Sequence, residues 1–480
     1  MVKESKQSGG LEWRINVPNE TAAKVLVSES KSQIRVCNGL RGLIVGFMTR
    51  IWKFLQKAWS LAVREPKKAI HGVKVGVALS IVSLFYYMRP LYDGVGGNAM
   101  WAVMTVVVVF EYTVGATLCK CVNRAIGTFL AGALGLGVHW IANQSGEKFK
   151  PIIIEVSVFL LAAAATFSRF IPTIKARFDY GAMIFILTFS LVSVSGYRVD
   201  ELFELAHDRL STIAIGTSLC ILTTMIFCPV WAGNELHYLI TNNMEKIADS
   251  LNGCVVEYFG INENVNSKDE ASDKVSQGYK CVLNSKATEE AMANFARWEP
   301  AHGRFNFRHP WNEYLKVGAL LRKCAYCIET LNVSTNSDTE APVILKKHFS
   351  KYCIGLSSSS SDVLKEMAVI MNTMTKSTKI DLMVNEMNDA VQELQGVLKS
   401  LSKQPIIRDS KNGTGGGNKS STTMVRVMEI VPIVSISTLL IEIAARIEKG
   451  VEAINELANK AEFEEGTKKS KQSENQQNSS

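Results

Sequence analysis

Residues 151–170 read PIIIEVSVFLLAAAATFSRF, an apolar run that carries one charge, Glu155, before Arg169. A bilayer core is crossed by about 20 mostly apolar residues in a helix, which satisfies its own backbone hydrogen bonds. The run therefore predicts a transmembrane helix. Similar runs lie on both sides of it, and together they predict six spans at 72–88, 99–117, 123–142, 151–170, 179–196 and 210–230.

Short polar segments with turn-forming and charged residues separate the runs. We place these breaks at 89–94, 119–124, 143–148, 169–177 and 198–208. Because the breaks are short, consecutive helices are expected to be antiparallel neighbours. Small residues crowd the third span, at Gly127, Gly132 and Gly135, and the fourth span, at 162–165. They let helices approach closely, so both spans are expected inside the bundle.

The composition divides the chain of 480 residues near Pro229, where the last apolar run ends and a charge-rich sequence begins. In the second half, apolar residues recur at three- and four-residue spacing, which predicts helices. The expected fold class is an all-α membrane protein, with about six transmembrane helices followed by a helical cytosolic domain. The predicted parts are a basic N-terminal segment (1–71), a transmembrane anion-pore domain (72–231), a helical cytosolic domain (232–407), a flexible linker (408–423), an amphipathic C-terminal helix (424–465) and a disordered tail (466–480).

The formal net charge of +8 does not predict nucleic-acid binding, because the basic residues are dispersed and largely balanced by acids in the second half. No secretory signal pattern opens the chain. Residues 34–66 mix basic with large apolar side chains. This mixture predicts a basic amphipathic helix, either on the surface of the lipid membrane or packed on the soluble domain.

Basic residues before the first span set the predicted orientation. Lys53, Lys57, Arg64, Lys67 and Lys68 precede it closely. Such residues stay on the cytosolic side of a membrane, so the N-terminus is expected in the cytosol. An even number of spans returns the C-terminal half to the same side. The expected localisation is therefore an integral, multi-pass membrane protein with both termini cytosolic.

Cations at the ends of the spans predict an anion pathway. Basic side chains lower the cost of moving a carboxylate through a low-dielectric constriction, because Coulomb attraction offsets lost hydration. The two strongest candidates directly adjoin apolar sequence. The candidate pore residues are Arg124, Arg209, Lys175, Arg198, Lys74 and Arg177.

Acidic residues form two predicted groups. Glu111 lies within the second predicted span and is expected to pair with Lys120, Arg124 or Lys74, or to carry protons in a coupled carrier. The second group lies in predicted outer loops, where its oxygens would bind a divalent or trivalent cation or remain solvated. The acids of this second group are Asp93, Asp200, Glu201 and Glu204.

Enzymatic motifs do not emerge. The sequence contains no P-loop, GxSxG or HExxH pattern, and its seven histidines lack ligand spacing. Cys324 and Cys327 have metal-ligand spacing, but no second pair completes a site, so a buried helix is expected there. We therefore expect neither an enzyme nor a cofactor, and no firm metal site.

Longer motifs carry a family resemblance. Residues 94–111 read GVGGNAMWAVMTVVVVFE and lead to Asn123 and Arg124. This sequence resembles the plant aluminium-activated malate transporter family. Trp298-Glu299-Pro300, followed by HGRF at 302–305, is similar to a signature of that family. Further motifs with the same resemblance are RFIP at 169–172, FDYG at 178–181, SGYR at 195–198 and CPVWAG at 228–233.

The resemblance implies a homodimeric channel for malate and other anions, in the plasma membrane or the vacuolar membrane. It implies pore roles for Arg124 and Arg209, with further basic positions at Lys175 and Arg198. Some members of the family sense aluminium through extracellular acids, and the resemblance implies this extracellular cation-sensing role for Asp93, Asp200 and Glu204. Two alternatives stay open: a proton-coupled exporter of organic or aromatic acids, and a membrane-anchored scaffold.

Overall fold

The computed structural model describes residues 45–88, 99–195, 202–260, 268–306, 308–335, 341–401 and 427–465. The predicted linker at 408–423 and tail at 466–480 lie outside these residues. Contacts divide the chain into two units, Met1–Gly72 and Val73–Ser480. The first unit contains a helix at 45–64 and the start of α2.

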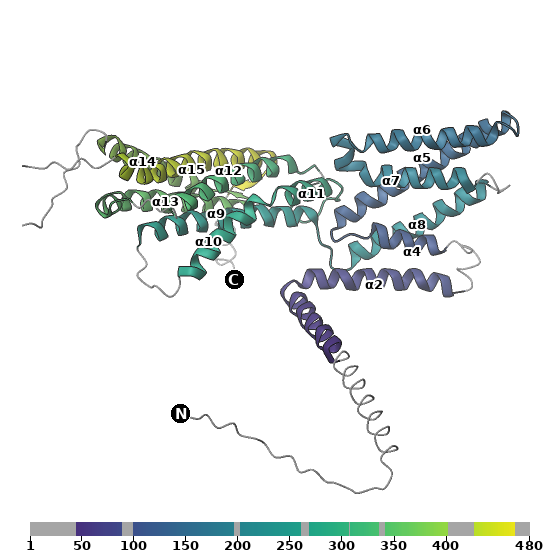
Figure 1. Ribbon diagram of the computed structural model, residues 1–480, viewed down its shortest axis with the longest axis horizontal. Helices are drawn as coiled ribbons and strands as arrows, with labels where there is room; N and C mark the ends of the chain where they lie inside the picture. Colours follow the sequence, from purple (N-terminus) through teal and green to yellow (C-terminus); the bar gives the residue numbers. More distant parts are fainter. Residues whose placement is uncertain are drawn as a thin grey trace, which may run out of the picture. The chain divides into compact units, whose positions relative to one another are not determined.

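Helices make up nearly all regular structure of the described residues (Figure 1). The apolar half contains α2 (Pro66–Tyr87), α4 (Ala99–Val109), α5 (Val114–Gln144), α6 (Lys150–Ser168), α7 (Pro172–Ser195) and α8 (Leu202–Ile226). The second half contains α9 (Ala232–Phe259), α10 (Lys268–Leu283), α11 (Lys286–Ala296), α12 (Trp311–Thr335), α13 (Val343–Thr373), α14 (Lys379–Leu401) and α15 (Val427–Lys460). Two short strands, β1 (Thr375–Lys376) and β2 (Glu464–Glu465), pair in parallel. The all-α membrane class is confirmed.

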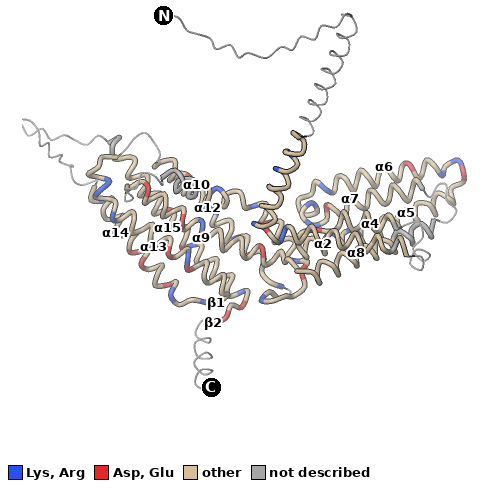
Figure 2. The backbone as a smooth tube through the Cα atoms, turned by 90° about the horizontal axis from the view of Figure 1, so that it is seen from below, with Lys and Arg blue, Asp and Glu red and all other residues tan. Residues whose placement is uncertain are grey.

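Four described helices are long and apolar enough to cross a membrane: α5, α6, most of α7 and most of α15. Figure 2 shows few charged residues along the first three. The helices α4 and α8 contribute the shorter apolar segments Met100–Val109 and Leu210–Ile226. The first predicted span, within α2, is not among the four. The count of six spans therefore stays a prediction.

The predicted break at 119–124 is wrong. The chain breaks at 110–113 instead, and α5 runs through 119–124 without interruption. Two threonines build this earlier break: the Thr113 side chain accepts a hydrogen bond from the Ala116 backbone N–H, and the Thr117 hydroxyl accepts one from the Glu111 N–H at 3.1 Å. Such side-chain acceptors satisfy the free N–H groups at a helix start. The second predicted span, 99–117, is therefore too long, because α4 ends at Val109.

Two further helices begin earlier than predicted. Helix α7 starts at Pro172 rather than residue 179, and α8 starts at Leu202 rather than residue 210. Proline suits the first turn of a helix, because the N–H that it lacks has no partner there. Charged residues in 172–178 and 202–209 favour a loop when the sequence is considered alone. In the structure these segments are helical, and they extend α7 and α8 beyond their apolar portions.

Helices α5 and α7 pack closely along their length. A Cβ atom at Gly127 would lie 2.7 Å from the carbonyl oxygen of Gly181, and one at Gly135 would lie 2.8 Å from Val192. Backbone contact at this distance requires glycine. The amide of Asn123 donates a hydrogen bond to the Arg177 carbonyl at 2.9 Å. Packing of small residues and polar side-chain bonds thus join the two helices, as expected for the third span. Helix α6, the fourth predicted span, has Ile154 as its one buried residue, so the prediction that it lies inside the bundle is wrong for the described chain.

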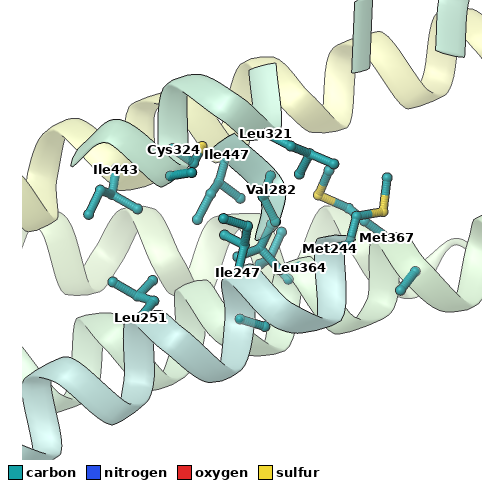
Figure 3. Close-up of a cluster of buried hydrophobic side chains, with 14 of the residues drawn as sticks. Met244, Ile247, Leu251, Val282, Leu321, Cys324, Leu364, Met367, Ile443 and Ile447 are labelled. Atoms are coloured by element: carbon teal, nitrogen blue, oxygen red, sulfur yellow. The ribbon is translucent and has the colours of Figure 1, made fainter. Parts of the chain in front are cut away.

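The second half buries one large apolar cluster between α9, α10, α12, α13 and α15. Figure 3 shows Met244, Ile247 and Leu251 of α9 directed towards Leu364 of α13 and Ile447 of α15. Helix α15 packs against α12 and α13, so its apolar side chains face protein in this cluster. The buried-helix prediction for Cys324 and Cys327 is confirmed, since both are buried in α12.

Replacing Gly127 by alanine is expected to lower the apparent melting temperature of the detergent-solubilised protein. The added methyl group cannot fit beside Gly181, and such overpacking costs about 1 to 3 kcal/mol. The control is Gly132→Ala on the same helix, where a Cβ meets nothing within 4 Å. Melting temperatures measured by intrinsic fluorescence should fall for the first variant only. Equal stability of both would show that α5 and α7 separate freely.

Candidate anion site

Helix α5 places two cations one turn apart. Lys120 and Arg124 are four residues apart, so they share one helix face. Tyr180 of α7 lies beside both: Arg124 Nη1 donates to the Tyr180 hydroxyl at 3.2 Å, and Lys120 Nζ lies 5.4 Å from the ring centroid. Glu111, in the break before α5, forms an ion pair with Lys120. These four residues form the α5–α7 charge cluster.

Arg124 has unused hydrogen-bonding capacity. It is buried, and among the residues that the structure describes none accepts a hydrogen bond from its Nε. A guanidinium carries five N–H donors, and a buried donor without a partner costs about 1 to 3 kcal/mol. An oxygen of a carboxylate or other anion would satisfy this donor. The arrangement therefore favours an anion at Arg124.

Of the three partners predicted for Glu111, which are Lys120, Arg124 and Lys74, the structure shows an ion pair with Lys120. It does not lie within a membrane helix as predicted, because the chain is non-helical at 110–113. Side chains of this pair are 28% and 37% exposed, so the pair itself adds little stability. Its main effect is on charge: Glu111 balances Lys120, and Arg124 remains as the uncompensated cation of the cluster.

Other predicted pore cations lie elsewhere. Lys74 is buried and donates to the Cys228 carbonyl at 2.7 Å, just beyond the end of α8. Carbonyls near a helix C-terminus attract cations, so this contact has a structural explanation. Lys175 and Arg177 are exposed in the first turns of α7. Of the predicted site residues, the described structure brings Arg124 and Glu111 into one cluster.

Several predicted residues escape description. Arg198, Asp93 and Asp200 lie outside the described residues. Arg209 and Glu204 belong to α8, but the structure does not describe their side chains. Helix α8 packs against both α4 and α5.

Sequence reasoning missed two members of the cluster as site residues, Lys120 and Tyr180. The four-residue spacing from Lys120 to Arg124 would have revealed a shared face, had 119–124 been assigned to a helix. Tyr180 lies within the FDYG motif, but a tyrosine in an apolar run carries no distinctive spacing. The wrong break at 119–124 therefore concealed the face that Lys120 and Arg124 share.

Glu299 links the helix of this cluster to the second half of the chain. It follows α11, and its side chain is 1% exposed. One carboxylate oxygen accepts hydrogen bonds from the Gly115 N–H at 3.1 Å and the Ala232 N–H at 2.6 Å, and the other accepts from the Gly233 N–H at 3.1 Å. These donors belong to the first turns of α5 and α9, where N–H groups lack partners within the helix and the helix dipole is positive. One carboxylate thus caps two helices.

Gly115 and Gly233 leave no room for a larger side chain at this contact. A Cβ at Gly115 would lie 2.3 Å from the Phe295 carbonyl oxygen, and one at Gly233 would lie 2.5 Å from the Trp311 ring. Burial raises the pKa of Glu299, and the N–H donors and His302 oppose this rise. We call Glu299 with its three donors the Glu299 junction.

The neighbouring motif residues support the junction. The Pro300 carbonyl lies 2.9 Å from His302 Nδ1, and the His302 ring stacks on Trp231 at 3.9 Å between centroids. Trp231 directly precedes α9. Trp298 is half-buried, and its backbone N–H donates a hydrogen bond to the Phe295 carbonyl at the end of α11. The motif predicted from sequence therefore surrounds a helix-capping carboxylate.

Two histidines, one in α9 and one just before α12, lie beside the same tyrosine. His237 Nδ1 lies 3.0 Å and His309 Nε2 lies 3.2 Å from the hydroxyl of Tyr314, which is buried in α12. Burial, together with a smaller effect of the positive charge of Arg304, lowers the pKa of His237 to about 4. Burial likewise lowers the pKa of His309 to about 4. Both histidines are therefore neutral in the folded protein at neutral pH.

Comparison with known proteins identifies the family. A family model described as aluminium activated malate transporter matches residues 59–420. The chain belongs to the aluminium-activated malate transporter family. This confirms the resemblance carried by its motifs, and both the α5–α7 charge cluster and the Glu299 junction lie within the match.

Individual members of the aluminium-activated malate transporter family match over most of their length. Aluminum-activated malate transporter 10 of Arabidopsis thaliana is 55% identical over 483 residues, covering 97% of each chain. Aluminum-activated malate transporter 2 of the same plant is 44% identical, over 88% of this chain and 81% of the relative. Aluminum-activated malate transporter 1 of Triticum aestivum is 41% identical, over 88% and 89%.

Replacing Glu299 by glutamine is expected to loosen the starts of α5 and α9. A glutamine amide offers one acceptor oxygen, and its NH₂ group faces an N–H donor, so about 2 to 4 kcal/mol of stability is lost. Hydrogen exchange measured by mass spectrometry should become faster in peptides that contain Gly115, Ala232 and Gly233. The control is Glu290→Gln on α11, where the side chain is 53% exposed. Unchanged exchange at all three amides would contradict the junction.

Acidification is expected to destabilise the second half through the histidine pair. The pKa of both side chains is about 4 when folded and about 6.5 in an unfolded chain. Between these values the unfolded chain binds protons that the folded chain excludes, so stability is full above about pH 6.5 and falls as the pH decreases. From pH 7 to 5 the loss is about 1 to 2 kcal/mol per histidine.

Hydrogen exchange of α12 peptides between pH 7 and 5, corrected for the intrinsic rate, measures this loss. His309→Gln should reduce the pH dependence by about half, since one of two titrating groups is gone. His348→Gln, at an exposed position on α13, is the control and should leave it unchanged. An identical pH dependence in the His309 variant would exclude the histidine pair as its source.

Proposed function

We propose that this chain conducts malate and related anions passively across a membrane, with Arg124 as a binding residue on the pathway. The observation that carries the proposal is the buried guanidinium of Arg124, whose Nε has no acceptor among the described residues. The names of the relatives supply the substrate class, because each is called a malate transporter. Anion transport requires cations of this kind at a low-dielectric constriction.

A passive pathway has more support than a proton-coupled one. A proton relay uses carboxyl groups inside the membrane segment. In the described part of the chain from α4 to α8, no carboxyl side chain is buried. Glu111 is paired with Lys120 and Asp179 with Arg169, and Glu147 and Glu155 are exposed. The charge of Arg124 suffices for an anion that binds weakly and leaves again.

Other features of the proposal rest on sequence. Arg209, Arg198, Lys175 and Arg177 are proposed to extend the cationic pathway, and Lys74 to shape it through its contact with Cys228. Asp93, Asp200 and Glu204 remain candidates for cation sensing. We also propose a homodimer in the plasma membrane or vacuolar membrane, with both termini in the cytosol.

Neutralising Arg124 tests the function. In patch-clamp recordings with malate as the main anion, Arg124→Gln should reduce the current at least tenfold, because the pathway loses its buried cation. Arg124→Lys should retain a substantial part of it. The matched control is Lys347→Gln, which removes an exposed cation from α13. All variants should reach the membrane in equal amounts, as measured by surface labelling.

Two results would contradict the proposal. Malate currents in Arg124→Gln that equal those of the unaltered protein would remove Arg124 from the pathway. Flux that follows an imposed pH gradient, with no accompanying current, would replace the passive pathway by a coupled carrier. A reversal potential that follows the malate gradient is the result expected of a channel.

A further inference from the structure

The helix at 45–64 reads VGFMTRIWKFLQKAWSLAVR and contains four basic residues and no acidic one. An α-helix turns by about 100° per residue. On this basis Arg50, Lys53, Lys57 and Arg64 fall within an arc of about 60°. Thr49, Gln56 and Ser60 lie next to this arc, and the rest of the circumference is apolar. The sequence thus divides the helix into a narrow cationic face and a wide apolar face.

The apolar face is uncovered in the structure. The exposed fractions are 65% for Phe47, 64% for Trp52, 71% for Phe54, 52% for Leu55 and 74% for Trp59. Contiguous apolar surface of this kind is rare on a protein that faces only water. A partner that buries the apolar face is therefore needed.

No residue in the described part of the chain forms an ion pair with the cationic face. Among the described residues no acid pairs with Arg50, Lys53, Lys57 or Arg64. Glu65, the nearest acid, forms its ion pair with Lys68 in the first turn of α2. A partner for this helix must consequently supply negative charge beside an apolar phase.

The position of the helix in the chain indicates the partner. Only Glu65 separates it from α2, whose residues Ala78 and Val82 are buried with residues of α4 and α8 in the apolar half. The helix therefore precedes a member of the bundle directly. Basic amphipathic helices lie in a bilayer interface with their apolar side chains among the acyl chains and their cations near headgroups, and tryptophan is enriched at this depth.

We propose that the 45–64 helix lies in the membrane interface and binds anionic lipid headgroups through Arg50, Lys53, Lys57 and Arg64. Anionic lipid supplies both requirements at once, an apolar phase and negative charge. Each basic side chain near such a surface favours the bound state by about fivefold. This inference concerns anchoring and does not depend on which solute the protein transports.

Depth measurements on the full chain in lipid nanodiscs test the proposal. A genetically encoded spin-labelled residue replaces Ala58, in the middle of the apolar face, or Ser60, beside the cationic face. Collision rates with oxygen, which concentrates in lipid, and with a water-soluble nickel chelate report immersion. The label at position 58 should favour oxygen over nickel, and the label at position 60 should show the reverse.

Lipid composition tests the charge requirement. The nanodiscs contain zwitterionic lipid alone or with about one third anionic lipid, at low salt because salt screens such attraction. Anionic lipid should deepen the label at position 58 in the unaltered chain. The combined variant Arg50→Gln, Lys53→Gln, Lys57→Gln and Arg64→Gln should lose this response. A control with Gln at Lys347, Lys351, Lys376 and Lys449, all exposed, removes equal charge from the second unit and should keep it.

Three outcomes would overturn the proposal. Ready access of nickel to position 58 in both lipid mixtures would place the helix in water. Protection of position 58 from both reagents would show that protein covers the apolar face, through a second copy or another segment. Equal depth in both mixtures, unchanged in the combined variant, would show apolar insertion without recognition of anionic lipid. Melting temperatures equal to that of the unaltered chain would establish that each variant is folded.

Discussion

The carboxylate of Glu299 holds together the two halves of the unit Val73–Ser480. It accepts N–H groups from the first turns of α5 and α9, at Gly115 and at Ala232 and Gly233. A buried carboxylate is costly unless several donors surround it, and helix N-termini present such donors with a favourable dipole. Each partner therefore stabilises the other: the helices make burial of Glu299 tolerable, and Glu299 satisfies their free N–H groups. This contact requires glycine at 115 and 233, because a Cβ atom at either position would collide with the Phe295 backbone or the Trp311 ring.

The same helix that Glu299 caps carries the candidate anion site. Arg124 lies nine positions after Gly115 on α5, which is about 14 Å along a helix. Close packing against α7 at Gly127 and Gly135 fixes the middle of this helix. The position of Arg124 consequently depends on contacts before and after it on α5, one with the second half and one within the apolar bundle. A change in the second half that displaced Glu299 would act on the start of this helix directly.

Sequence alone could predict the fold class, because long apolar runs and helical spacing are properties of local sequence. It could also locate Arg124 from its position beside apolar residues. The break at 110–113 could not be predicted, since it depends on threonine side chains that bond to a backbone only when folded. The role of Lys120 could not be predicted for a similar reason. Its partners are Glu111, which lies in the break, and Tyr180, which lies on α7, and both come close to it only in the folded chain. The role of Glu299 is equally tertiary, because its donors are distant in sequence.

Charge at the site is set by cancellation. Lys120 is balanced by Glu111, and the positive end of the α5 dipole is occupied by Glu299. Of the cluster's two cations, only that of Arg124 therefore remains uncompensated. A dicarboxylate beside one buried guanidinium is only partly neutralised, so attraction offsets some of its lost hydration without holding it tightly. Conduction requires this balance, since an anion that binds too strongly does not leave. On the proposed passive pathway, the ion pair and the junction would both weaken the positive field that an anion meets beside Arg124, because one balances Lys120 and the other balances the positive end of the α5 dipole.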